Sequence, residues 1–187
     1  MELKEITIEV TQQCPNFCIH CSSLSSMTKQ CMMPYAKIEE LIDDAATLGC
    51  THLSLSGGEP FLRHDLTNIV SHAHRRKMDV SIYTSGIYHD GFSYNSLPLE
   101  ILKKLLPYEC KIIVNYEAAD DKTYDLIMGT HVDGFNLLKQ TIRHCVNLGF
   151  NVEAHTVPMA SNYFQIPSII SQCKALGVSM ISFLRLV

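Results

Sequence analysis

The chain of 187 residues lacks several features that mark broad classes of protein. It has no run of like charges and a net charge of −4, which excludes the electrostatic footprint of a protein that binds nucleic acid or an anionic membrane. No apolar run is long enough to span a bilayer, and no charged-then-apolar leader opens the sequence. No repeat or low-complexity segment is present. We therefore expect one globular domain in the cytoplasm, without nucleic-acid or membrane partners.

A second group of closely spaced cysteines is also missing. The cytosol keeps thiols reduced, so the eight cysteines are expected to be free thiols or metal ligands rather than a disulfide framework. Without a second Cys-x2-Cys pair, the sequence gives little support to a zinc protein or a thioredoxin-like protein. An auxiliary iron–sulfur centre is not expected either. The isolated Cys50, Cys145 and Cys173 lie on or near apolar helical stripes and are interpreted as small buried hydrophobic residues.

What is present is a compact triad, Cys14-x3-Cys18-x2-Cys21. Four-iron clusters are normally held by four cysteine thiolates, one for each iron. Three thiolates leave one iron with an open coordination position, where a small molecule can bind and be reduced. The triad therefore indicates a [4Fe–4S] cluster with a vacancy for a ligand.

Apolar periodicity alternates between strand and helix along the whole chain. Strands are predicted over 6–10, 52–56, 80–84, 111–116, 152–157 and 179–186. Helices are predicted over 38–48, 66–77, 99–106, 135–148 and 166–176. Six strands alternating with helices predict parallel pairing with right-handed crossovers. The fold class is therefore α/β, a partial (β/α)6 barrel of the TIM type, with its site in the loops after the strands. The triad lies in the first of those loops.

A second motif, Gly57-Gly58-Glu59-Pro60, follows the second predicted strand. The glycines allow backbone groups to approach a ligand closely, and the carboxylate of Glu59 suits an ammonium group. Alone, this motif is more often a tight turn than a binding site. Its position after a strand and downstream of the triad favours binding.

Together the two motifs resemble those of the radical S-adenosylmethionine (SAM) enzymes, and the resemblance covers almost all of residues 1–187 as one core domain. It is closest to the branch of sulfatase maturases, SPASM-type peptide-modifying enzymes and the GTP cyclase of molybdopterin synthesis. The resemblance implies that Cys14, Cys18 and Cys21 bind a [4Fe–4S] cluster, and that Gly57, Gly58 and Glu59 bind the methionine part of SAM. It also implies reductive cleavage of SAM to a 5′-deoxyadenosyl radical, which abstracts hydrogen from a substrate.

Other cofactor-binding positions follow from the same resemblance. His20 matches a position beside adenine, although a solvent-facing loop histidine is the alternative. Ser85 lies near the ribose or substrate, Asn115 contacts SAM, and Val187 at the tip of the sixth strand touches adenine.

Met128 departs from the pattern, because the relatives place there an arginine that helps to hold the methionine carboxylate. A thioether cannot replace a bidentate guanidinium. Arg185 is one candidate replacement, and a barrel-end arginine with its head in solvent is the alternative. Glu153 and His155 share one face of the fifth strand, either as groups that meet substrate or as buried polar residues.

The resemblance implies a small reductant protein of the flavodoxin or ferredoxin type as a partner. It leaves the substrate open between a peptide and a small molecule, since fold does not choose between them. Relatives continue beyond the position of Val187, so a truncated fragment that binds cluster and SAM without physiological turnover is the alternative reading.

Overall fold

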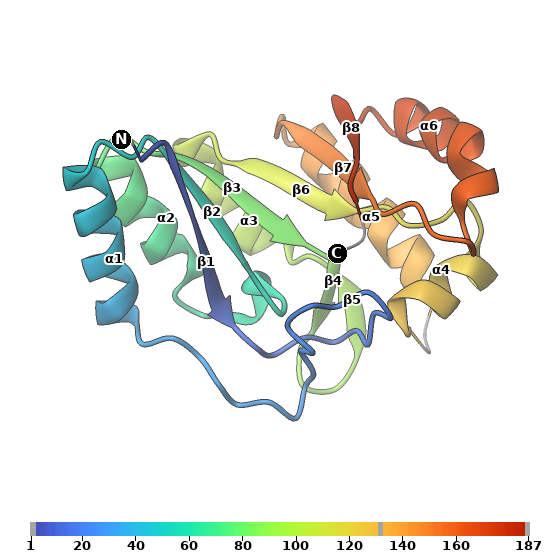
Figure 1. Cartoon of the computed structure of the whole chain (residues 1–187), viewed down its shortest axis with the longest axis horizontal. Coiled ribbons are helices and arrows are strands. Elements are labelled where there is room, and N and C mark those ends of the chain that lie inside the picture. The colour runs from blue at the N-terminus through green and yellow to red at the C-terminus, as the bar shows by residue number, and fades with distance from the viewer. Residues whose placement is uncertain (1–2, 131–132, 186–187) are drawn as a thin grey trace.

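The chain folds around a parallel sheet of six strands, which is open rather than closed into a barrel (Figure 1). We describe a computed structural model over residues 3–130 and 133–185. The sheet order is β1-β2-β3-β6-β7-β8, and every neighbouring pair is parallel. The strands are β1 (Glu5–Thr11), β2 (His52–Gly57), β3 (Asp79–Thr84), β6 (Lys111–Asn115), β7 (Val152–Thr156) and β8 (Met180–Phe183). The predicted partial barrel is confirmed in its strand number and direction.

Helices connect successive strands of the sheet (Figure 1). They are α1 (Tyr35–Thr47), α2 (Leu66–Arg75), α3 (Leu99–Leu105), α4 (Asp121–Met128), α5 (Gly134–Asn147) and α6 (Ile166–Ala175). Three short 3-10 turns complete the connections: η1 (Pro60–Leu62), η2 (Leu106–Tyr108) and η3 (Tyr163–Gln165). Within the described residues, no helix is both long and apolar enough to cross a membrane.

The two faces of the sheet differ in chemistry because side chains alternate along each strand. One face is apolar and packs against the helices, and it supplies much of the core: Ile8, Val10, Leu53, Leu55, Val80, Ile82, Ile112, Val114, Val152 and Ala154. Burial of each large side chain of this kind stabilises the fold by about 1.5–3 kcal/mol. The opposite face is polar and carries Glu5, Glu9, Ser54, Ser56, Ser81, Tyr83, Lys111, Asn115, Glu153 and His155. We call this second face the polar face.

Two elements were not expected from periodicity. A hairpin of β4 (Ile87–His89) and β5 (Tyr94–Ser96) follows β3. Its strands are short and mostly polar, and its turn is built by Asp90, whose carboxylate accepts the N–H groups of Phe92 and Ser93 at 2.8 Å. Helix α4 begins at an Asp120 side chain that accepts the Thr123 N–H and ends at Gly129, which has a φ of 61°. The last strand spans Met180–Phe183 and is therefore shorter than the predicted range of 179–186. Position 186 lies outside the described residues.

Candidate functional site

A long connection between β1 and α1, which we call the cysteine loop (residues 12–34), carries the triad across the ends of the strands. Its backbone is fixed at both sides. The N–H of Gln12 donates to the carbonyl of Cys31 at 2.8 Å, and the N–H groups of Phe17 and Ile19 donate to the carbonyls of Met128 and Ile127 at the end of α4. The loop is thus joined to an element more than a hundred residues away in the sequence.

A buried arginine anchors the two ends of the cysteine loop. The Arg63 guanidinium donates to the backbone carbonyls of Val10 at 2.7 Å and Met33 at 2.8 Å. It also forms a bidentate pair with Asp65. Because the Arg63 side chain is buried, its hydrogen bonds fix the distance between the start and the end of the loop.

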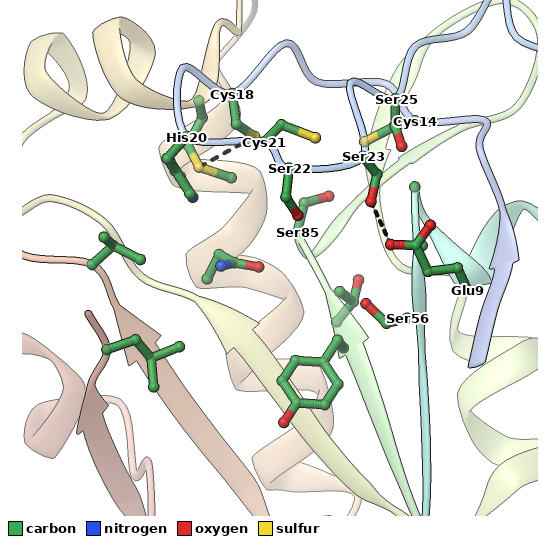
Figure 2. A pocket seen from close by; sticks show the side chains of 18 residues that line it. Glu9, Cys14, Cys18, His20, Cys21, Ser22, Ser23, Ser25, Ser56 and Ser85 are labelled. Atoms are coloured by element: carbon green, nitrogen blue, oxygen red, sulfur yellow. Dashed lines mark hydrogen bonds between the residues drawn. The ribbon is translucent and has the colours of Figure 1, made fainter. Parts of the chain in front are cut away.

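The three triad cysteines line one pocket of about 330 Å³ (Figure 2). Cys14 is buried, whereas Cys18 and Cys21 are partly exposed. Burial raises the pKa of the Cys14 thiol well above its ordinary value and that of Cys18 to about 12. A bound iron centre reverses this direction, since a coordinating thiol is deprotonated. Within the described residues, no three His, Cys, Asp or Glu side chains converge on a single metal ion.

Buried polar atoms without a protein partner gather in the cysteine loop. They are the side-chain oxygen and nitrogen of Asn16, the Nδ1 of His20 and the hydroxyl of Ser25. Most buried polar groups in proteins are hydrogen-bonded, so such atoms need an explanation. Of these residues, His20 and Ser25 line the pocket, where a polar group bound beside the three cysteines would meet them, whereas Asn16 does not line it. The residues present therefore fit an iron–sulfur cluster with a polar ligand.

The two glycines of the second motif dock the β2 end against the cysteine loop. A Cβ at Gly57 would lie 2.4 Å from the carbonyl oxygen of Thr11, and one at Gly58 would lie 2.0 Å from that of Gln13. The N–H of Gly58 donates to Thr11, and the N–H of Glu59 donates to Gln13 at 2.7 Å. The glycines thus permit contact with the loop backbone, and both also line the pocket.

The Glu59 side chain lies differently from the sequence-based expectation of an ammonium ligand. It is 0 % exposed, and its carboxylate accepts the Thr84 hydroxyl at 2.8 Å and both the N–H and hydroxyl of Ser85 at 2.9 and 2.7 Å. A weaker bond comes from the N–H of Phe61 at 3.3 Å. A carboxylate offers about four acceptor sites. Glu59 therefore connects β2 to the end of β3, and its burial raises its pKa to about 7.

His20 and Asn115 both line the pocket and meet at a buried carboxylate. Glu117 accepts the N–H of Val157 at 2.8 Å and the Asn115 amide at 3.3 Å, and its Oε1 lies 3.5 Å from Nε2 of His20. Burial raises the pKa of Glu117 to about 7 and lowers the pKa of His20. The alternative of a solvent-facing His20 is thus not what the structure has.

Met128 and Arg185 also lie at definite positions. Met128 is buried, lines the pocket and has its sulfur 3.8 Å from the sulfur of Cys18. Arg185 is exposed. Among the residues that the structure describes, no lysine or arginine lines the pocket. Ser85 lines the pocket, whereas Val187 lies outside the described residues.

Comparison with known families identifies this arrangement. The family model of the radical SAM superfamily matches residues 8–164. The chain belongs to the radical SAM superfamily. Members of this family use a [4Fe–4S] cluster and SAM.

Two of the proteins that this radical SAM chain resembles in sequence illustrate the likeness. It is 25% identical over 183 residues to a probable GTP 3′,8-cyclase of Methanococcus aeolicus. The matched region covers 95% of this chain and 58% of that relative. It is 35% identical over 81 residues to the PqqA peptide cyclase of Streptomyces rochei, which covers 43% of the chain and 22% of that relative. The chain therefore spans only part of the length of the relatives that it matches.

Solved structures of radical SAM proteins share the fold. Streptococcus suis SuiB bound to SAM superposes with a TM-score of 0.82 at 18% identity, over 100% of this chain and 41% of SuiB. The protein anSMEcpe with bound AdoMet gives 0.79 at 12% identity, over 100% of this chain and 52% of that one. These likenesses confirm the open parallel sheet of the radical SAM core.

Several residues that line the radical SAM pocket were missed by sequence reasoning. They are Glu9, Ser22, Ser23, Ser25, Ser56, Tyr83, Val157 and Leu184. Figure 2 shows Glu9 and Ser56 on the opposite side of the pocket from His20. The Ser23 hydroxyl donates a hydrogen bond to the Glu9 carboxylate. Strand alternation signals Glu9, Ser56 and Tyr83 once the inward face is known. The loop serines carried no such signal.

The Glu153 and His155 pair lies on the polar face and is buried there. Lys111 forms an ion pair with Glu153 at 2.6 Å, and the rings of Tyr83 and His155 meet edge-to-face at 5.5 Å. The cysteines expected in the core, Cys50, Cys145 and Cys173, are all buried, as is Cys110, whereas Cys31 is exposed.

Proposed function

We propose that this chain binds a [4Fe–4S] cluster through Cys14, Cys18 and Cys21 and cleaves SAM reductively to modify a peptide. One observation carries the proposal: the three thiols line the same pocket as Gly57 and Gly58. When bound, the cluster supplies an electron that splits SAM into methionine and a 5′-deoxyadenosyl radical, which takes a hydrogen atom from the substrate.

The protein's own contribution is to place and orient these groups. The backbone of Ser56, Gly57 and Gly58 offers acceptors for the ammonium of methionine, and Glu59 fixes the position of Ser85, which also lines the pocket. The pocket lining formed by the described residues carries hydroxyl groups and no guanidinium. Hydroxyl donors therefore hold the methionine carboxylate, which an arginine at position 128 would otherwise hold.

The adenosine end of SAM is assigned to the opposite part of the pocket. His20 and Asn115 line that part, and their contacts with Glu117 limit their movement. We propose that His20 stacks on adenine, that Asn115 and Ser85 contact the nucleoside, and that Val187 adds an apolar contact to adenine.

A peptide is the substrate class that the relatives favour. One similar protein is named PqqA peptide cyclase, and SuiB has been solved with its precursor peptide SuiA. The electron is proposed to come from a flavodoxin or ferredoxin in the cytoplasm, where thiols stay reduced. We take residues 1–187 as one radical SAM core domain.

Anaerobic reconstitution with iron and sulfide tests this function. The wild-type chain is expected to gain visible absorption and, after reduction, to release 5′-deoxyadenosine from SAM. The variant C14A/C18A/C21A is expected to do neither. C31A is the matched control, because Cys31 is an exposed thiol in the same loop. Equal iron uptake by the triple variant and the wild type would contradict the proposal.

A further inference from the structure

Ser25 stands apart among the hydroxyl groups of the site. It is 6 % exposed, and its oxygen has no hydrogen-bond partner. Neighbouring hydroxyls are engaged: Ser23 donates to Glu9 at 2.5 Å, Ser85 donates to Glu59, and Ser26 pairs with Thr28 at 2.9 Å. A buried hydroxyl without a partner destabilises the protein, because it has lost its hydrogen bonds to water. This destabilisation is removed if a bound group accepts its hydrogen.

The position of Ser25 indicates which bound group that is. Ser25 lines the main pocket together with all three triad cysteines, and it also lines a smaller pocket on the same loop with Cys18 and Cys21. Figure 2 shows it on the loop segment that carries the cysteines. The side chain thus shares its surroundings with the sulfur atoms of the triad.

We propose that the Ser25 hydroxyl donates a hydrogen bond to a sulfur of the cluster and thereby raises its reduction potential. This proposal rests on the proposed function, since it requires the cluster on Cys14, Cys18 and Cys21. Reduction adds negative charge to the cluster and its thiolates, and a donor at sulfur stabilises that charge. Hydrogen bonds to the sulfurs are among the factors that set such potentials.

The experiment is a potentiometric titration of the reconstituted protein without SAM, followed by the EPR signal of the reduced cluster. S25A is expected to shift the midpoint potential to a more negative value. S25T keeps the hydroxyl and is expected to return the potential toward that of the wild type. S26A is the control, because the Ser26 hydroxyl lines only the smaller pocket and already pairs with Thr28.

Each outcome has a defined meaning. EPR reports only loaded clusters, so reduced iron uptake by S25A does not obscure its potential. An S25A potential equal to that of S26A overturns the proposal. An unchanged S25A potential with weaker SAM binding also overturns it, and assigns the hydroxyl to SAM. Absence of any cluster in the wild type would instead refute the function on which the proposal rests.

Discussion

At the scale of single residues, Glu59 shows how burial decides what a motif residue contacts. Its motif predicts a carboxylate that faces a ligand, yet the carboxylate accepts from Thr84, Ser85 and Phe61 and is 0 % exposed. A ligand ammonium would have to displace one of these donors. We therefore expect Glu59 to position the end of β3 rather than to bind SAM directly.

E59Q tests that role. The amide nitrogen must face a donor, so the variant is expected to unfold at lower urea concentration and lose about 1–3 kcal/mol. In cluster-loaded protein, the affinity ratio between SAM and an analogue without the amino group should stay as in the wild type. Calorimetric titration with both ligands measures it. A loss of affinity confined to SAM would return Glu59 to the role of ammonium ligand.

Glu117 provides a second prediction, based on pH. Burial raises its pKa from the ordinary value of 4.5 to about 7, so the folded protein keeps a proton that the unfolded chain releases. Unfolding then releases protons between these values, and stability falls as the pH rises through this window. A glutamine mimics the protonated form. E117Q is therefore expected to gain stability relative to the wild type at pH 8 and to differ little at pH 5.

Urea unfolding of cluster-free protein at both pH values measures this difference. E40Q serves as the control, because the Glu40 carboxylate is exposed and pairs with Lys37 on one helix. A stability difference between E117Q and the wild type that is the same at both pH values would contradict the prediction.

At the scale of elements, the contact between the β2 end and the cysteine loop is the least tolerant of change. G58A introduces a Cβ at 2.0 Å from the Gln13 carbonyl, which is backbone and cannot rotate away. Relief of the clash breaks the bonds from Gly58 to Thr11 and from Glu59 to Gln13. We expect a loss of about 3 kcal/mol or more from overpacking and lost hydrogen bonds, and reduced iron uptake.

G91A is the matched control for the glycine variant. Gly91 has a φ of 97° and open space around its Cα. Alanine there meets backbone strain of about 1–2 kcal/mol but no clash. Iron uptake by G91A should equal that of the wild type, measured as iron per protein after reconstitution. Normal uptake by G58A would show that the close approach is not needed to hold the loop.

The elements that sequence predicted are those with strong periodicity. The six strands of the main sheet follow from alternating or continuous apolar residues, and their predicted bounds lie within a few residues of the observed ones. The β4–β5 hairpin was missed because Tyr94, Asn95 and Ser96 carry no apolar alternation. Helix α4 was missed although Asp120 and Gly129 are recognisable caps.

From the residues alone, the site was predictable only where its residues are contiguous, whereas His20, Ser85 and Asn115 were named from the family resemblance. Cys14, Cys18 and Cys21 stand within one short segment, and so does the glycine motif. Contacts that depend on tertiary structure were not predictable. The sulfur of Met128 reaches Cys18 only because two backbone hydrogen bonds join α4 to the cysteine loop, 110 residues away.

At the scale of the whole molecule, the sheet separates an apolar face under the helices from a polar face that leads to the pocket. Glu9 and Tyr83 belong to both the polar face and the pocket lining. The polar face presents carboxylates, hydroxyls and the ammonium group of Lys111 next to the pocket to which the cofactor is assigned. This arrangement suits a polar substrate such as a peptide better than an apolar one.

The central ion pair of the polar face carries the last prediction. Glu153 is buried and its carboxylate lies 2.6 Å from Nζ of Lys111, which is about one third exposed. K111M leaves the carboxylate without its cation, and we expect a loss of about 1–3 kcal/mol, below the value for a fully buried pair. K111M/E153Q removes both charges and should recover most of that loss, because the pair itself costs desolvation.

Urea unfolding of the two single variants and the double variant closes the cycle. If the double variant is no more stable than K111M, the Glu153 carboxylate does not destabilise the fold when Lys111 is removed, because water solvates it. In that case the polar face around Glu153 is hydrated, and Lys111 is available to a substrate carboxylate. Recovery in the double variant instead means that the pair is a fixed part of the fold, and that Lys111 is held by Glu153 rather than available to another group.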